Sequence, residues 1–313
     1  MLDERTGKAL QTRDESGSTS SPTMCHPGVS RRRAIGSIAM FVAFILLSAC
    51  TDYVSQIEDR IEERERASII NQSSDDSRFT SSDSRSGLDP ESSNSSEKPS
   101  SDKVVDPAEV TSGTMTDSRD GQTYKTVTIG SQTWMAENLN YETANSYCYN
   151  DNAANCTKYG RLYTWAAAMD SAGTWSTNGK GCGYNKTCSP TGTIRGVCPE
   201  GWHLPTNAEF ETLFTAVGGS SNAGTKLKST SGWNEDNGTD DYSFSALPAG
   251  YRSAFSSYNR REGDGANFWS STGSDSSDAY YMYLYYFGGN VELRSYSKDN
   301  GFSVRCVKDL QVE

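Results

Sequence analysis

The sequence predicts a loop-rich α+β domain that is held by disulfides and preceded by a long disordered segment. Three observations support this class. Apolar periodicity marks two early helices and several short strands. Six cysteines follow a signal-like N-terminus, and an even number in an exported domain indicates disulfides. Only 34% of the residues are hydrophobic although 11% are aromatic, as expected when a polar, unfolded part dilutes a globular one.

Residues 1–49 have the pattern of a signal peptide, and we expect the true start to be Met24. Arg31-Arg32-Arg33 precedes an apolar run over 34–47, which is too short to span a membrane comfortably. The run ends in Leu47-Ser48-Ala49-Cys50, which resembles the lipobox of bacterial lipoproteins. The resemblance implies that Cys50 is lipidated and anchors the protein to the cell envelope, in the outer membrane. An ordinary cleaved signal with a chance cysteine is the alternative.

Residues 50–112 are predicted to be a disordered tether between the lipid and a folded domain over 113–313. The stretch 71–112 is rich in Ser, Asp and Glu and has too few apolar side chains to fold. A flexible chain of about 60 residues has an r.m.s. reach of about 45 Å. The formal net charge of −11 excludes nucleic acid as an expected partner, because phosphate binding needs a basic face.

The folded domain is expected to begin with a hairpin. Residues 124–129 are rich in β-branched side chains, Gly130-Ser131 forms a turn, and residues 132–135 return. A first helix is predicted over 162–169, where apolar side chains recur at i, i+3, i+4 and i+7.

The second helix is the best-marked element of the chain. Thr206 and Glu209 have the spacing of a capping box, which places the helix start at this threonine. Phe210, Leu213 and Phe214 begin an apolar face, and Gly218-Gly219 supplies the stop. Strands are then expected in five later segments: 244–252, 268–271, 280–287, 291–296 and 302–307.

A series of motifs over residues 117–308 resembles the Fibrobacter succinogenes major paralogous domain family (FISUMP). The resemblance implies an exported or lipid-anchored protein without an assigned activity. The motifs are Asp120-Gly121 with Tyr124, Gln132-Thr-Trp-Met-Ala-Glu-Asn-Leu139, Tyr159-Gly-Arg-Leu-Tyr-Thr-Trp-Ala166, Val197-Cys-Pro-Glu-Gly-Trp-His-Leu-Pro-Thr206, Ser245-Ala-Leu-Pro-Ala-Gly-Tyr-Arg252, Phe268-Trp-Ser-Ser271 and Gly301-Phe-Ser-Val-Arg-Cys306.

Two segments are more distantly similar to the formylglycine-generating enzyme superfamily. They are Leu204-Pro-Thr-Asn-Ala-Glu-Phe210 and the closing Gly301-Phe-Ser-Val-Arg305. This similarity implies a C-type-lectin-like fold, with two helices beside twisted antiparallel sheets and long loops. It is an analogy of fold and does not by itself define a function.

Six cysteines allow fifteen pairings, and two pairs are close enough in sequence to close locally. Cys148 and Cys156 flank one loop, and Cys182 and Cys188 flank another. Cys198 and Cys306 would then form a long bridge, and the resemblance to C-type-lectin-like folds, where such a bridge is familiar, agrees with this pairing.

Few residues could perform catalysis. His203 is the sole histidine after the signal, and its place between Trp202 and Leu204 favours a packed, hydrogen-bonded role over a catalytic one. Formylglycine-generating enzymes act through cysteines near the end of the domain, where this chain has only Cys306. We therefore expect no enzyme activity; an enzyme related to that superfamily is the less favoured alternative.

Two groups of residues are candidates for ligand binding. Asn234, Asp236, Asp240 and Asp241 form an oxygen-rich loop that could hold calcium; a solvated turn is the alternative. Tyrosines at alternate positions could stack on sugar rings, unless their strand is buried on both sides. These tyrosines and two tryptophans are the aromatic candidates: Tyr281, Tyr283, Tyr285, Trp233 and Trp269.

The sequence therefore predicts a non-catalytic cell-surface lipoprotein that binds a polysaccharide or an envelope protein. A structural envelope component without a ligand is the alternative, since no motif identifies the partner.

Overall fold

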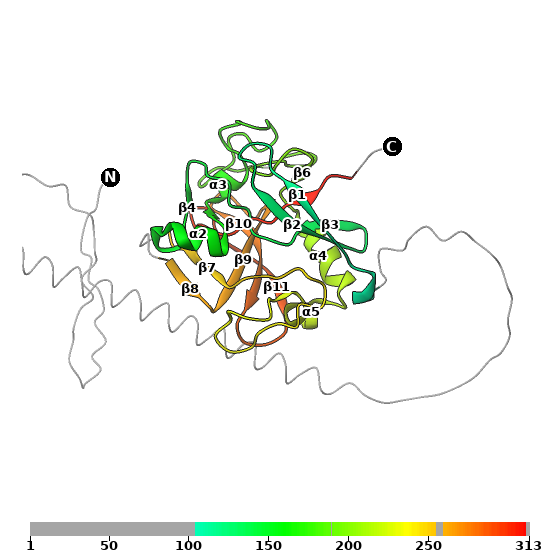
Figure 1. The fold of residues 1–313 in the computed structure, drawn as a ribbon. Helices are drawn as coiled ribbons and strands as arrows, with labels where there is room; N and C mark the ends of the chain where they lie inside the picture. Colours follow the sequence, from blue (N-terminus) through cyan, green and yellow to red (C-terminus); the bar gives the residue numbers. More distant parts are fainter. Residues whose placement is uncertain (1–103, 189, 255–258, 311–313) are drawn as a thin grey trace, which may run out of the picture. The chain divides into compact units, whose positions relative to one another are not determined.

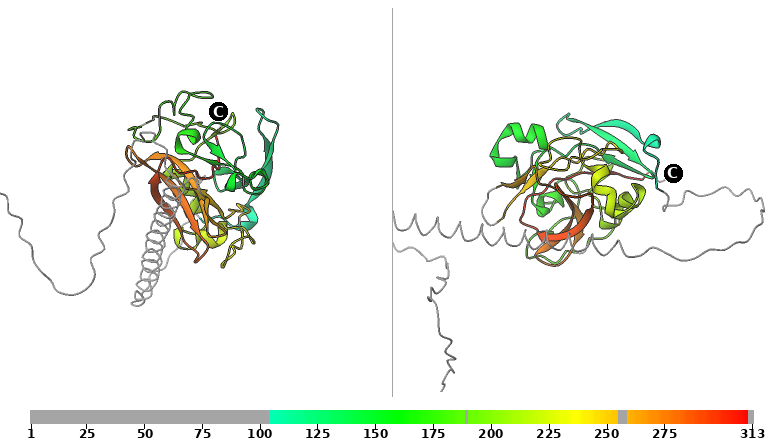
Figure 2. Two further views of the ribbon diagram at one scale, coloured as in Figure 1. Left: turned by 90° about the vertical axis from the view of Figure 1, so that its left-hand side faces the viewer. Right: turned by 90° about the horizontal axis from the view of Figure 1, so that it is seen from below.

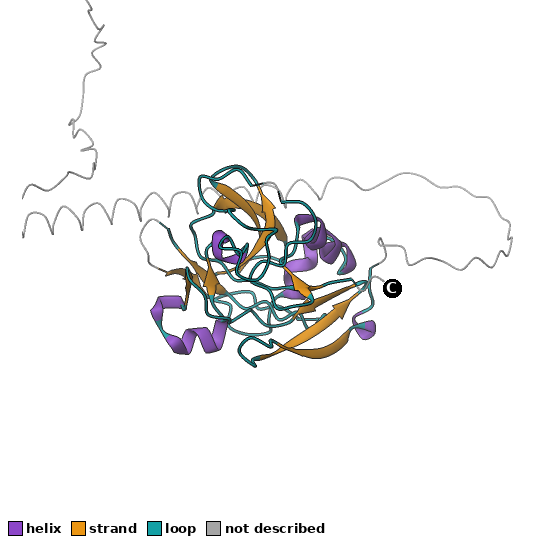
Figure 3. Cartoon of the chain, turned by 90° about the horizontal axis from the view of Figure 1, so that it is seen from above, coloured by secondary structure: helices purple, strands orange, loops and turns teal. Residues whose placement is uncertain are grey.

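The computed structural model describes residues 104–188, 190–254 and 259–310, which all belong to one compact unit, Asn94–Glu313. The predicted signal peptide, Cys50 and most of the predicted tether lie outside the described residues. Within them, two five-stranded sheets, a small two-stranded sheet and short helices are joined by long loops, so the α+β class is confirmed (Figures 1 and 3). No helix in the described part is long and apolar enough to cross a membrane.

The first sheet joins the two ends of the domain. Strands β2 and β3 form the predicted hairpin around Gly130-Ser131 (Figure 1). Trp134 of β3 pairs with Val307 of β12. All its neighbouring strands are antiparallel. Its order is β1 (Thr111–Thr116), β2 (Thr123–Ile129), β3 (Gln132–Met135), β12 (Val307–Lys308) and β6 (Trp202–His203).

The second sheet comes from the C-terminal half of the domain. Its neighbours are antiparallel apart from the parallel pair β7–β9. In both views of Figure 2, the β1–β2 hairpin lies on the opposite side of the domain from β10 and β11. The order is β11 (Val291–Ser297), β10 (Asp278–Tyr285), β9 (Gly265–Gly273), β7 (Ala249–Arg252) and β8 (Asn259–Glu262).

The helices are short, and side-chain caps set where several of them begin. The capping box of α4 is present as predicted: the Thr206 side chain accepts from the Glu209 N–H, and the Glu209 side chain accepts from the Thr206 N–H. The described helices are η2 (Pro107–Glu109), η3 (Tyr149–Asp151), α2 (Ala153–Tyr159), α3 (Trp165–Ala168), α4 (Asn207–Ala216) and α5 (Ser220–Leu227).

The first predicted helix is shorter than expected. Leu162–Tyr163 is strand β5, which pairs with β4 (Ser146–Tyr147), and α3 begins only at Trp165. The Tyr163 backbone exchanges hydrogen bonds with Phe302, and the Thr164 side chain then caps the helix by accepting from the Ala167 N–H. Long-range pairing with the last segment of the domain thus overrides a local helical pattern.

The ordered domain begins earlier than residue 113. Strand β1 starts at Thr111, and the Val105 N–H donates to Ala216 O at 2.8 Å. The Tyr242 hydroxyl in turn donates to Val105 O at 2.9 Å. Residues 104–112 were predicted to belong to the tether because their composition is polar. Backbone pairing places them on the domain instead, a contribution that composition does not reveal.

Three disulfides link the six cysteines in the pairs expected from the sequence: Cys148–Cys156, Cys182–Cys188 and Cys198–Cys306. The last closes a sequence separation of 108 residues and joins the segment before α4 to the segment before β12. Both of its cysteines are fully buried. This bridge therefore fastens the middle of the domain's chain to its C-terminal segment inside the core.

Candidate ligand-binding surface

The predicted stacking residues do not form an exposed surface. Tyr281, Tyr283 and Tyr285 are only 7%, 5% and 9% exposed, and the tryptophans are buried as well, Trp233 at 5% and Trp269 at 0%. Strand β10 is internal to its sheet, and α4 and α5 pack against the sheet. The prediction of a stacking face on β10 is therefore wrong, because the strand is covered on both sides.

Both tryptophans have structural partners. The Trp269 ring stacks on Phe302 with ring centroids 4.2 Å apart, and its Nε1 donates to Tyr163 O at 2.7 Å. The Trp233 Nε1 donates to Ser229 Oγ at 3.1 Å. Each indole thus fills the core with its ring and satisfies its N–H there.

The four candidate metal ligands do not converge on one point. Asn234 Nδ2 donates to Asp264 Oδ1 at 2.7 Å, and Asp236 Oδ2 accepts from the Gly288 N–H at 3.1 Å. Asp240 accepts from Ser245, while Asp241 is exposed. Among the described residues, no group of three or more acidic, His or Cys side chains is placed to hold a metal ion.

A buried lysine, Lys228, donates to a backbone carbonyl of this loop. Lys228 is 1% exposed, and its ammonium donates to four backbone carbonyls. Burial lowers the pKa of Lys228, although the charge of Asp236 opposes the shift. The carbonyl acceptors, with distances from Nζ, are Asp236 O at 2.7 Å, Gly288 O at 3.1 Å, Tyr285 O at 3.3 Å and Tyr286 O at 3.5 Å.

An exposed aromatic residue occurs on the neighbouring strand, β11, which forms the edge of the sheet. Tyr296 is 39% exposed, and Glu292 and Arg294 alternate with it on the same face of β11. Arg294 Nε donates to Glu292 Oε2 at 2.6 Å, and Asn290 Nδ2 donates to Glu292 Oε1 at 2.7 Å. The edge strand thus presents a ring and a fixed ion pair in one row.

Residues around Tyr296 hold its ring in place. Its ring stacks on Phe302 with centroids 6.3 Å apart, and it meets Tyr251 edge to face at the same separation. Phe302 is buried and contacts both tyrosines, so the rings of Tyr251 and Tyr296 rest on the core. Pre-organised rings of this kind lose little conformational entropy when a ligand stacks on them.

Two arginines extend this row over the buried tyrosines. Arg261 Nη1 donates to the Tyr283 hydroxyl at 2.8 Å, and the Arg294 Cζ lies 4.7 Å from the centroid of the same ring. Both guanidinium groups therefore meet at Tyr283, one from β8 and one from β11. We call Tyr251, Arg261, Glu292, Arg294 and Tyr296 together the outer surface.

The sequence analysis missed the outer surface. The alternation of Glu292, Arg294 and Tyr296 is visible in the sequence, and it predicts that these side chains share one face of a strand. Which strand lies at the sheet edge depends on pairings far along the chain, so the exposed tyrosine could not be distinguished from the buried ones.

The residues with potential for catalysis have structural roles. His203 is buried, with Nδ1 2.7 Å from Asp309 Oδ1 and Nε2 2.7 Å from Glu209 Oε1. The pKa of His203 is raised: burial lowers it, but the bonds and charges of Glu209 and Asp309 outweigh burial. Cys306 is fully buried in its bridge to Cys198. The imidazole thus clamps β6, α4 and the C-terminal segment together.

The fold and its motifs define a disulfide-linked, loop-rich α+β domain. A model of the Fibrobacter succinogenes major domain matches residues 127–308, more than half of the chain. The chain belongs to this family, which confirms the resemblance seen in its motifs. No curated protein and no solved structure matches the chain.

Proposed function

We propose that this protein is a non-catalytic lipoprotein of the bacterial cell surface whose domain binds a glycan through the outer surface. Acylated Cys50 would anchor it, in the outer membrane, and the tether would carry the domain away from the lipid. The observation that carries the proposal is the exposed, supported ring of Tyr296 beside the Arg294–Glu292 pair.

The chemistry of the outer surface suits a sugar. A tyrosine offers an apolar ring for the C–H face of a pyranose and a hydroxyl at its tip. A guanidinium fork donates to two neighbouring oxygens, and a carboxylate accepts from hydroxyl groups. Arg294 and Glu292 provide both kinds of group side by side. Arg294 is two residues from Tyr296, about 7 Å along the strand.

A non-catalytic role agrees with the state of the two reactive side chains. Both ring nitrogens of His203 are bonded to carboxylates, and Cys306 is a disulfide partner without exposed surface. A nucleophile and a general base need access to a substrate.

The C-type-lectin-like fold is part of the same proposal. Its support is the pair of sheets, the helices packed beside them and the long bridge Cys198–Cys306, as in the family implied by the distant resemblance. Fold alone does not define the ligand, so the proposal depends on the outer surface.

Binding of the full-length protein to an array of envelope and plant polysaccharides tests the proposal. Tyr296→Ala should weaken binding of any retained glycan by about tenfold, the loss of a stacking contact of about 1.4 kcal/mol. Phe287→Ala is the matched control, because Phe287 is an aromatic residue of similar exposure, 40%, that lies away from the outer surface. Phe287 follows the C-terminal end of β10, whereas Tyr296 lies opposite Ala279 near the N-terminal end of that strand. Equal binding by both variants, or no binding to any polysaccharide, would refute glycan recognition at this surface; the latter would favour a structural envelope role.

The anchor has its own test. Intact-mass analysis of native protein should show a lipid on Cys50, and Cys50→Ala should release the chain from the membrane fraction. Unchanged membrane partition of the variant would exclude the lipid anchor.

A further inference from the structure

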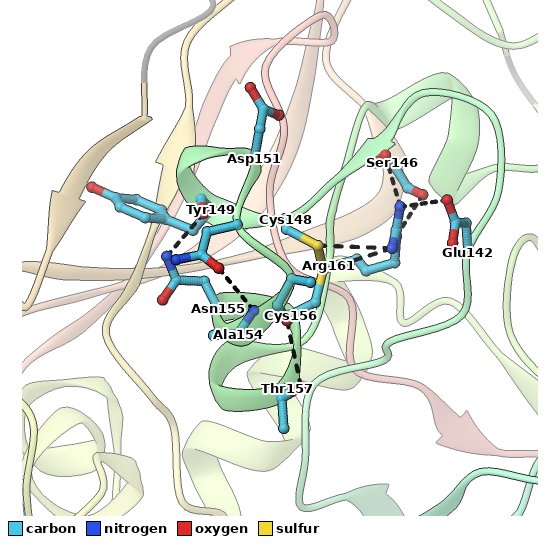
Figure 4. The surroundings of a disulfide bond; sticks show 12 residues. Glu142, Ser146, Cys148, Tyr149, Asp151, Ala154, Asn155, Cys156, Thr157 and Arg161 are labelled. Carbon is cyan, nitrogen blue, oxygen red and sulfur yellow. Dashed lines mark hydrogen bonds and ion pairs between the residues drawn. A yellow bond between two sulfur atoms is a disulfide. The ribbon is translucent and has the colours of Figure 1, made fainter.

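One disulfide lies beside a fixed positive charge. Arg161 Nη1 is 3.9 Å from Cys148 Sγ and 3.7 Å from Cys156 Sγ (Figure 4). The arginine is held by Ser146, whose Oγ accepts from Nε at 3.0 Å, and by Glu142, whose Oε1 lies 3.2 Å from Nη2. The guanidinium therefore faces both sulfurs in a defined geometry.

A guanidinium in this position changes the chemistry of the bond. Positive charge next to a cysteine lowers the thiol pKa and stabilises the thiolate. In thiol–disulfide exchange, a sulfur with a lower thiol pKa also leaves faster. Arg161 thus favours both the opening of the bond and the reduced product.

Access to the bond is one-sided. Cys148 is partly exposed, whereas Cys156 is only 6% exposed within α2. An attacking thiolate would reach Cys148 Sγ, and Cys156 Sγ would leave next to the guanidinium. The bridge Cys198–Cys306 differs in this respect, because both of its cysteines are 0% exposed.

We propose that Cys148–Cys156 is a thiol-exchange site that is opened by a dithiol reductant. One thiolate of the dithiol attacks Cys148 Sγ, the S–S bond breaks, and Cys156 leaves as a thiolate that then takes a proton. The second thiol of the reductant attacks the mixed disulfide and releases Cys148. The cysteine pair gains two electrons and two protons, and the dithiol becomes a disulfide.

Opening this bond would release a segment that docks on the second sheet. Asp151 Oδ1 pairs with Arg252 Nη1 at 2.9 Å, and the Tyr159 hydroxyl donates to Glu262 Oε1 at 2.8 Å. Asn150 and Asp151 have φ angles of 54° and 51°, which non-glycine residues keep only when their surroundings hold them. Strand β8, which carries Arg261, should therefore loosen on reduction. An effect of this loosening on glycan affinity rests on the proposed function, whereas the thiol exchange itself does not.

Differential alkylation of the full-length protein across a dithiothreitol series tests the exchange site. Cys148 and Cys156 should be labelled at the lowest reductant concentration, before the other four disulfide-bonded cysteines. Arg161→Met should raise the required dithiothreitol by about tenfold, equivalent to roughly 30 mV for this two-electron couple, and Arg161→Lys should restore most of the wild-type behaviour. Lys158→Met is the control, because Lys158 is an exposed cation of α2, the helix that carries Cys156, and it contacts Tyr159 and Glu262 instead of the disulfide.

Two results would overturn the exchange site: another pair opening first, or Arg161→Met with a native melting temperature and an unchanged midpoint. Hydrogen exchange of residues 259–262 after selective reduction tests the coupling. Faster exchange supports the release of β8, and unchanged exchange refutes it. Neither readout depends on a glycan, so a failure of the proposed function would be recognised separately.

Discussion

The two five-stranded sheets differ in what holds them and in what they present. The first assembles strands from both ends and the middle of the domain, and the Cys198–Cys306 bridge and the His203 clamp fasten the middle segment to the C-terminal one. The second is built from neighbouring hairpins and carries the outer surface with Tyr296. The difference teaches that one sheet closes this fold, while the other carries the exposed edge that we propose contacts a ligand.

Positive side chains fall into a buried group and a surface group. Lys228, Lys298 and Arg305 are buried and donate to backbone carbonyls, whereas Arg261 and Arg294 lie over tyrosine rings at the outer surface. Lys298 donates to Asp275 O at 2.6 Å and to two further carbonyls, and Arg305 donates to the carbonyls of Phe244 and Ser245. In a domain with long loops, buried cations satisfy carbonyl groups that no strand or helix pairs.

The largest effect should come from breaking the bridge of the first sheet. Cys306→Ser should lower the free energy of unfolding by about 4 to 5 kcal/mol, because a loop of about 100 residues is no longer closed in the unfolded chain. Urea unfolding of the purified domain measures the loss. A change below about 1 kcal/mol would show that the bridge does not fasten the middle segment to the C-terminal one.

Lys228→Met tests the buried cations and should cost about 3 kcal/mol. Four carbonyls would lose their common donor, and unsatisfied buried acceptors are destabilising. Lys308→Met, at an exposed position of β12, is the control and should stay within about 0.5 kcal/mol. Equal melting temperatures of the two variants would contradict a structural role for the bonds from Lys228 to these four carbonyls.

Cys148→Ser should be milder than Cys306→Ser, at about 2 kcal/mol. Its loop has a sequence separation of only 8 residues, and the entropy of loop closure grows with loop length. The same urea titration provides the comparison. A larger loss than for Cys306→Ser would reverse the proposed order of the two bridges.

The His203 clamp should make stability depend on pH. Because the folded-state pKa lies above the ordinary value of 6.5, the stabilisation is complete below about pH 6.5 and is lost as pH rises through the folded pKa. The pKa of Glu209 is lowered: burial raises it, but the bonds and charge of His203 and the bonds from Thr206 outweigh burial. Its contribution is therefore present above about pH 4.5 and is lost as pH falls through its folded pKa.

His203→Gln should remove the loss on the alkaline side, at an overall cost of about 1 to 2 kcal/mol at pH 6, since charge-assisted bonds are lost. Melting temperatures between pH 5 and pH 9 measure the dependence. Parallel curves for the variant and the wild type would exclude the imidazolium clamp.

The smallest effect on stability should come from the outer surface. Tyr296→Ala should change the free energy of unfolding by less than about 1 kcal/mol, because the ring stands on the core but is well exposed. Thermal unfolding of the variant checks this. A loss of several kcal/mol would mean that Tyr296 belongs to the core, and the comparison between the two sheets would weaken.

The sequence by itself determined the features that depend on near neighbours. The Thr206–Glu209 cap and the Gly130-Ser131 hairpin form between residues a few positions apart, so their signals are complete within a short window. The two short disulfide loops are equally local.

Only the tertiary structure decided which aromatic residues are exposed and where the buried charges lie. Tyr283 and Tyr296 both stand in alternating strands, yet β10 is internal and β11 lies at the edge. Lys228 has no sequence mark of burial, because its carbonyl partners come from a loop and a strand end up to 60 residues away. Burial is set by what covers a residue, and in this fold those covers come from segments far along the chain.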